Sequence, residues 1–251
     1  MSVQRPSHTS DTTLQAGFGV LLVALYYVAQ IWLIPTLPDP TSIVEALATQ
    51  LEQGLIDAIA DALRAILLGF VIAVVVGIPL GVLMGVNRVA ERLIDPYVNA
   101  LYVIPYAALV PAFIIWFGTG FTVRLVVTFM FALFPITINT LEGAKTTPIN
   151  LIEVARSFNA GRLFVLKNVV LPHELPYILA GLRLGVGRAV KGLVVAEILI
   201  SVSGIGGILT QWSAAYRLEG VASIVLILMG LGIVLPWVFN KIYDRVIWWD
   251  V

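Results

Sequence analysis

The sequence has no cysteine and only two histidines, His8 and His173. The absence of cysteine excludes disulfides, thiolate catalysis and cysteine-ligated metals, and two histidines are too few for a histidine-rich zinc site. Charged residues make up only 12% of the 251 residues, about half the fraction that is usual for soluble domains. Fifteen basic and fifteen acidic residues cancel. The chain therefore lacks the positive charge that nucleic-acid binding requires, and we expect neither a metal site nor a nucleic-acid partner.

The chain also lacks the residues for ATP chemistry. The dipeptide Gly-Lys occurs nowhere, so there is no Walker loop to hold the phosphates of a nucleotide. No convincing pair of catalytic carboxylates and no Ser-His-Asp arrangement can be assembled either. We therefore expect no enzymatic activity and no cofactor in this chain. An energy source would have to lie in another chain or in an ion gradient.

Long apolar segments are what the sequence has in abundance. Hydrophobic residues make up 59% of the chain, and the mean hydropathy is +0.97. About 20 mostly apolar residues are needed to cross a bilayer as a helix. The sequence predicts an all-α membrane protein with six transmembrane helices, at residues 17–35, 61–86, 97–118, 122–141, 175–200 and 220–243.

The distribution of basic residues predicts the orientation. Loops 87–96 and 142–174 and the C-terminal tail carry Lys and Arg, whereas residues 36–60 carry four acidic residues and no basic one. Basic loops mark the cytoplasmic side, with Arg64, Arg124 and Arg217 as minor exceptions. We expect both termini in the cytoplasm and a multi-pass location in the inner (plasma) membrane. The predicted divisions are a tail at 1–16, a first helix and outer loop at 17–60, a core at 61–245 containing the cytoplasmic loop 142–174, and a tail at 246–251.

Smaller patterns refine this arrangement. Gly77, Gly81 and Gly85 follow at four-residue spacing, which predicts a smooth helix face where another helix packs closely. The acidic outer loop predicts a short surface helix from about residue 41 to 53, with one apolar stripe. The glycine-rich segment 203–207 is interpreted as a plain outer loop, with a flexible outer turn or a re-entrant element as the alternative.

Charged residues within the fifth predicted span are candidates for the translocation pathway. Charges in a membrane helix usually face a cavity or a partner. At about 100° per residue, Arg188 and Lys191 share one face and Glu197 lies nearly opposite Arg188. Arg188 and Lys191 are candidates for a positive lining that attracts an anion, and Glu197 is a candidate near the outer gate. Ion pairing with other helices or with a second chain is the alternative reading.

The cytoplasmic loop 142–174 contains two short predicted helices that meet at a turn. Leu151, Ile152, Ala155 and Phe158 form an apolar face on the first helix, and a second run, 163–170, is expected to end at Leu171-Pro172. An apolar face on a short cytoplasmic helix indicates a docking site for another protein.

This loop resembles the signature of ABC importer permeases. That signature is Glu-Ala-Ala, three residues, Gly, nine residues and Ile-x-Leu-Pro, and the chain has Glu153-Val154-Ala155, Asn159 and Val169-Val170-Leu171-Pro172 at the same spacing. Asn159 replaces the glycine, and Asn is the non-glycine residue best able to adopt the left-handed conformation at such a turn. Segments such as 77–81, 134–136 and 180–184 resemble the nitrate, sulfonate and taurine branch of this family.

The resemblance implies a type I ABC importer permease fold and a division of labour between chains. A dimer of ABC ATPase subunits would bind ATP and Mg²⁺, an extracytoplasmic solute-binding protein would deliver a small anion, and a second permease copy would complete the pathway in the lipid bilayer. The ATPase-docking loop would comprise Glu153, Val154, Ala155, Arg156, Ser157, Phe158, Asn159, Ala160, Gly161, Leu171 and Pro172.

Two other classes of protein remain as alternatives. An ion-coupled secondary transporter would usually show inverted repeats and acidic residues at the membrane midplane, and neither is clear in this sequence. A membrane-embedded enzyme or scaffold would need a convergent nucleophile or metal cluster, which is missing.

Overall fold

The computed structural model describes residues 17, 18, 21, 24–28 and 30, then residues 36–200 and 203–246, with only the backbone of 242–246. Within these residues every regular element is a helix. In chain order the helices are α2 (Pro40–Glu52), α3 (Leu55–Val86), α4 (Arg88–Val103), α5 (Tyr106–Phe117), α6 (Phe121–Lys145), α7 (Ile149–Ser157), α8 (Arg162–Val165), a π-helical turn (Leu166–Val170), α9 (Leu171–Ile200), α10 (Gly204–Ala214) and α11 (Leu218–Val246).

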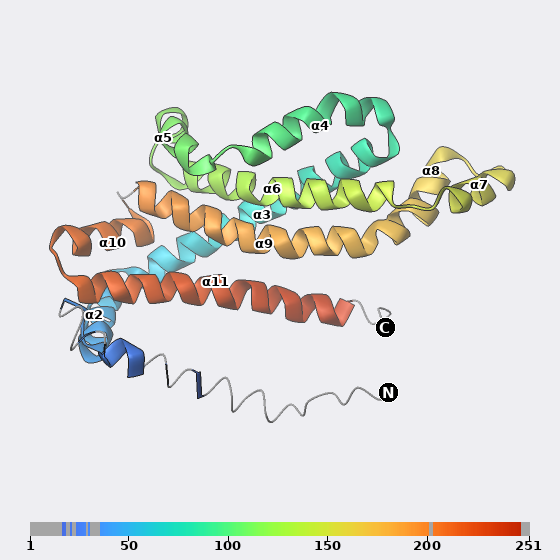
Figure 1. Cartoon of the computed structure of the whole chain (residues 1–251). Helices are drawn as coiled ribbons and strands as arrows, with labels where there is room; N and C mark the ends of the chain where they lie inside the picture. The colour runs from blue at the N-terminus through green and yellow to red at the C-terminus, as the bar shows by residue number, and fades with distance from the viewer. Residues whose placement is uncertain are drawn as a thin grey trace.

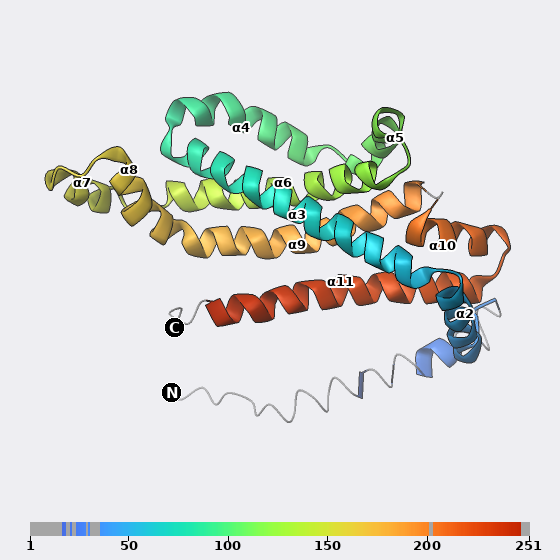
Figure 2. The same ribbon diagram turned by 180° about the vertical axis from the view of Figure 1, so that it is seen from behind.

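The long helices α3, α6, α9 and α11 form a bundle in which α3, α6 and α11 run in one direction and α9 runs in the opposite direction (Figures 1 and 2). α6 packs against α3 on one side and α9 on the other, and α11 packs against α9. One end of the bundle carries α2, α5 and α10, and the opposite end carries α7 and α8. The two ends of the bundle therefore carry different short helices.

Three helices are long and apolar enough to cross a membrane by themselves: α3, α6 and residues 218–241 of α11. Counting the bent pair α4–α5 and the pair formed by residues 162–200 and α10 raises the number to five at most. The predicted spans 61–86, 122–141 and 220–243 coincide with the first three. The predicted span 17–35 falls mostly outside the described residues.

The predicted third span is wrong as a single straight helix, and the predicted loop 87–96 is wrong as well. α4 begins at Arg88, where the Asn87 side chain caps it by accepting hydrogen bonds from the Val89 and Ala90 backbone N–H groups at 2.9 and 3.3 Å. α4 and α5 then meet at an angle of 97°. Pro105 has no N–H to continue the helix, and the Tyr106 hydroxyl instead donates to the Leu101 carbonyl. A hydropathy window cannot detect this break, since the predicted span 97–118 is mostly apolar on both sides of Pro105.

The predicted glycine face is confirmed as a close contact between α3 and α6. A Cβ atom at Gly81 would lie 2.6 Å from the Cβ of Thr140, so only glycine fits without a shift. From the other side, a Cβ at Gly185 of α9 would lie 2.8 Å from the Ile136 side chain. α6 is therefore packed closely between two helices, as small residues allow in membrane bundles.

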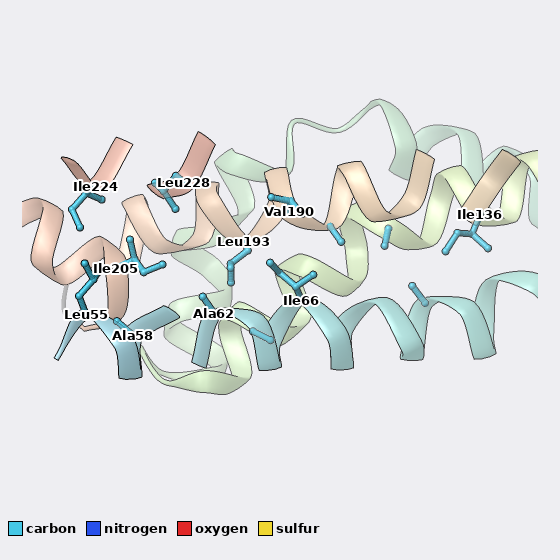
Figure 3. Packing of buried hydrophobic residues seen from close by; sticks show 14 residues of the cluster. Leu55, Ala58, Ala62, Ile66, Ile136, Val190, Leu193, Ile205, Ile224 and Leu228 are labelled. Carbon is cyan, nitrogen blue, oxygen red and sulfur yellow. The ribbon is translucent and has the colours of Figure 1, made fainter. Parts of the chain in front are cut away.

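The main apolar core lies toward the end that carries α2 and α10. Leu55, Ala62 and Ile66 follow one side of α3 and face Leu193 of α9 and Ile205 of α10 (Figure 3). Ile224 and Leu228 bring α11 into the same cluster. Packing of this kind stabilises helix association in lipid, where water exclusion contributes little.

The predicted surface helix in the acidic loop is confirmed as α2. It begins with Pro40 at its first position, where the missing N–H of proline costs nothing. Its Gln50 is fully buried, donates to the Gly220 carbonyl at 3.0 Å and accepts from the Ser223 hydroxyl at 2.8 Å. α2 is therefore attached to the start of α11 by specific hydrogen bonds, in addition to its apolar stripe.

Candidate ATPase-docking loop and translocation pathway

Helix α7 lies at the tip of the α7–α8 end of the bundle (Figure 1). None of its residues is buried. Val154 is 56% exposed and Phe158, directly after the helix, is 83% exposed. Large apolar side chains at an aqueous surface indicate contact with another molecule. The exposed apolar surface thus lies on the loop that the sequence predicts as a docking site.

The turn after α7 has the conformation predicted from the sequence. Asn159 has φ = 62°, in the left-handed region. Its N–H donates to the Arg156 carbonyl at 2.8 Å, and the Ala160 N–H donates to the Ala155 carbonyl at 3.1 Å. These bonds satisfy carbonyls that a helix end would leave free. Asparagine therefore fills the structural role of the signature glycine.

The apolar face predicted for α7 is wrong as a single surface, because it divides into two. Ile152 and Ala155 pack inward on a small cluster with Val165 and Val170, whereas Leu151 and Phe158 are exposed. Ile152 and Ala155 hold α7 against the segment that follows it. Leu151 and Phe158 remain exposed and can contact another molecule. Among the predicted docking residues, three are partly buried and the others are exposed; the partly buried ones are Ala155, Ala160 and Leu171.

Leu171 and Pro172 do not end a helix, so this prediction is wrong. α9 begins at Leu171 and continues without interruption from the π-helical turn. A proline ring clashes with the carbonyl four residues earlier in an α-helix. The wider π-helical turn immediately before Pro172 relieves that clash. The docking loop therefore leads directly into the charged helix α9.

Arg188 and Lys191 are both exposed on α9, as the shared face predicts. Arg188 contributes to a cavity of about 230 Å³ that is otherwise formed by the break between α4 and α5 and by two phenylalanines of α6. We call it the elbow cavity; its lining residues are Tyr102, Ile104, Pro105, Tyr106, Ala107, Phe131, Phe134 and Arg188. Lys191 lies outside it. Neither cation forms an ion pair with any described residue.

Glu197 lies apart from the two cations and is fully buried. It forms an ion pair with Arg124 of α6, with 3.1 Å between Nε and Oε1 and side chains only 5% and 1% exposed. Arg124 also donates from Nη2 to the Ser203 hydroxyl at 2.7 Å. Arg124, an exception in the charge pattern, is thus the partner that Glu197 requires inside the bundle.

The same carboxylate holds the start of α10. The Gly206 N–H donates to Glu197 Oε2 at 3.0 Å. A Cβ at Gly206 would lie 1.8 Å from the Glu197 carbonyl oxygen, and Gly204 has φ = 71°. The interpretation of 203–207 as a plain loop is wrong, because helix α10 begins at Gly204. Glycine is needed here for both the left-handed conformation and the close approach.

Comparison of the sequence with known protein families shows which family the chain belongs to. The family model described as "Binding-protein-dependent transport system inner membrane component" matches residues 77–248. The chain belongs to this permease family. The family prediction is therefore confirmed, as is a multi-pass location in the inner membrane. The match includes the docking loop, the elbow cavity and the Arg124–Glu197 pair.

Individual relatives agree with this assignment. The permease is 36% identical over 163 residues to a protein of Methanocaldococcus jannaschii named as an ABC transporter permease, covering 64% of this chain and 61% of that one. It is 34% identical over 205 residues to the taurine transport system permease of Escherichia coli, covering 78% and 74%. It is 40% identical over 116 residues to a protein of Bacillus subtilis named as an aliphatic sulfonates transport permease, covering 46% and 42%. The chain therefore matches less than two thirds of the first and third of these relatives.

Sequence reasoning missed the structural importance of Arg124 and Tyr106 in the permease. A signal existed for Arg124, since an arginine among apolar residues of a membrane helix needs a partner. Its partner is 73 positions away, however, and only packing brings the two together. Tyr106 gave no such signal, because its role depends on the break at Pro105.

Proposed function

We propose that this permease is the membrane-spanning subunit of an ATP-driven importer for a small anion. It would act with a dimer of ABC ATPase subunits, a second permease copy and an extracytoplasmic solute-binding protein. The observation that carries the proposal is the α7 loop, with exposed apolar residues at one tip of the bundle, in a chain that belongs to the binding-protein-dependent permease family.

The ATPase subunits would contact the outward face of the docking loop. Val154 and Phe158 offer apolar surface, and Glu153 and Arg156 offer charges beside it. Apolar anchors surrounded by polar groups are typical of protein interfaces. The inward contacts of Ile152 and Ala155 support this role by holding α7 in one orientation.

ATP and Mg²⁺ would bind to the ATPase subunits. Within the part of the chain that the structure describes, no group of three or more His, Cys, Asp or Glu side chains could hold a metal ion. ATP-driven closure of the two ATPase subunits would move the docking loops and, through them, the helices that follow. The bundle would then change from facing inward to facing outward.

Arg188 and Lys191 would attract the anion along the pathway, while Glu197 would contribute through its ion pair near the outer gate. Two relatives are named for aliphatic sulfonates and for taurine, and both solutes carry a sulfonate group. Two cations without an ion pair among the described residues suit such a group. The anion would be delivered from the side of α2 and α10.

The proposed topology has six spans with both termini in the cytoplasm. The four parts would be a tail at 1–16, the first helix and outer loop at 17–60, the core at 61–245 with coupling loop 142–174, and a tail at 246–251. The arrangement of α7 and α8 at one end and the acidic α2 at the other supports it, because basic loops favour the cytoplasmic side.

Affinity purification from native membranes followed by mass spectrometry tests the assignment. We expect an ABC ATPase and an extracytoplasmic binding protein to purify with the chain. The double substitution Val154→Glu with Phe158→Glu should abolish ATPase association while the permease still inserts. Lys167→Gln, an exposed change on the returning segment, should leave association unchanged. A chain that purifies alone and takes up solute only with an ion gradient would contradict the proposal.

A further inference from the structure

The elbow cavity has an ordered aromatic wall. The Tyr106 ring stacks on Phe134 with centroids 5.8 Å apart and lies against Phe131 at 5.3 Å. Tyr106 is only 8% exposed, and its hydroxyl is already bonded to the Leu101 carbonyl. These three rings therefore line the cavity with the Tyr106 hydroxyl already bonded, and Tyr102 adds a fourth ring together with its own hydroxyl.

Among the described residues that line the elbow cavity, Arg188 is the only charged one. Its guanidinium forms no ion pair with any described residue. A guanidinium presents two parallel N–H donors to an oxyanion such as a sulfonate or a carboxylate. One side of the cavity thus suits an acid group, and the other sides suit an apolar one.

The composition of the walls selects against other anions. An inorganic oxyanion would lose hydration against the faces of the Tyr106, Phe131 and Phe134 rings, which cannot replace its hydrogen bonds. A zwitterion would bring an ammonium group into a cavity that has no acidic residue within its described lining. The attraction of an ammonium to ring faces is weaker than the cost of removing its water without a counter-charge. A short apolar body next to a single acid group avoids both costs.

We propose that the elbow cavity is a binding site for an organic monoanion, in which Arg188 holds the acid group and the aromatic wall holds a short apolar body. This inference rests on the proposed function, since it names the class of anion that the pathway accepts. The volume of about 230 Å³ accommodates a solute several times larger than a water molecule.

Direct binding to the complete permease–ATPase complex in lipid nanodiscs tests the inference without the solute-binding protein. Butanesulfonate, taurine and sulfate are compared at equal ionic strength by isothermal titration calorimetry. We expect butanesulfonate to bind at least tenfold more tightly than either of the other two. Equal binding of the three anions would overturn the inference.

Two variants and one control locate the site. Arg188→Gln should weaken butanesulfonate binding at least tenfold. Tyr102→Ala removes a ring that is 40% exposed, and should weaken butanesulfonate several-fold while leaving sulfate unchanged. Arg92→Gln removes an exposed arginine outside the cavity and should change nothing. Unchanged butanesulfonate binding in Tyr102→Ala would overturn the inference even if Arg188→Gln fails to assemble.

Failure of the inference differs from failure of the proposed function. If the ATPase purifies with the chain and drives uptake, but the elbow variants bind and transport normally, only the inference is wrong. If no ATPase associates with the chain, the proposed function is wrong.

Discussion

Two charged side chains are enclosed inside the bundle at Arg124 and Glu197, and each depends on the other. Removing both charges from water is costly, and their mutual attraction offsets that cost only when the geometry is good. Here the Ser203 hydroxyl and the Gly206 N–H provide further hydrogen bonds. The pair thus joins α6, α9 and the start of α10 at one point.

Arg124→Met should destabilise the permease strongly, since it leaves Glu197 buried without a counter-charge. A loss of about 3–5 kcal/mol in the free energy of unfolding is expected for a broken buried pair. Thermal unfolding in detergent, followed by tryptophan fluorescence, measures the loss as a lower midpoint.

The double variant Arg124→Met with Glu197→Met is the matched control. It removes both charges, so it should recover much of the stability lost in Arg124→Met. A double variant less stable than the single variant would show that the two residues contribute independently.

Helix α6 depends on small residues in its neighbours. Gly81→Ala would place a methyl group 2.6 Å from the Cβ of Thr140 and 2.7 Å from the Thr137 carbonyl oxygen. Overpacking of this kind costs about 1–3 kcal/mol. We expect a lower unfolding midpoint in detergent and a smaller folded yield from membranes.

Gly230→Ala is the control for this substitution. Gly230 lies in α11, and nothing is within 4 Å of the position that its Cβ would occupy. Because alanine favours helix over glycine, Gly230→Ala should be neutral or slightly stabilising. Equal losses in the two variants would indicate a general intolerance of alanine for glycine, not close packing of α3 on α6.

Hydropathy and glycine spacing predicted the straight helices α3, α6 and α11 well, but they did not predict the break between α4 and α5. α3, α6 and α11 each exceed the length of a bilayer, and their apolar runs are unmistakable. Pro79, Pro111 and Pro135 lie inside continuous helices, whereas Pro105 separates α4 from α5. The difference depends on which neighbours satisfy the freed carbonyls, and a single sequence does not contain that information.

Those parts of the candidate site that are formed by residues close together in the sequence could be predicted. The loop 142–174, which contains the docking residues, has a motif at fixed spacing, and the left-handed conformation of Asn159 follows from its residue type. The elbow cavity and the Arg124–Glu197 pair join residues from separate helices. Their assembly depends on packing between those helices, which spacing along one helix cannot reveal.

The absence of cysteine from the whole chain allows a direct test of its orientation. Tyr216, 92% exposed in the turn before α11, and Val154, 56% exposed on α7, lie at opposite ends of the bundle. In right-side-out vesicles, a membrane-impermeant maleimide should modify Tyr216→Cys. It should modify Val154→Cys only after permeabilisation. Modification of Val154→Cys in sealed vesicles would contradict the proposed topology.

Helix α9 connects the two ends of the molecule as one rigid element. It has 30 residues, which corresponds to about 45 Å at 1.5 Å per residue. Its first two residues, Leu171 and Pro172, belong to the predicted docking loop, and Glu197 lies three residues before its end. An α-helix compresses very little along its axis, so α9 can transmit a displacement from one of its ends to the other. A displacement imposed on the docking loop would then reach the Arg124–Glu197 pair with almost its full amplitude, and without a relay of intermediate contacts.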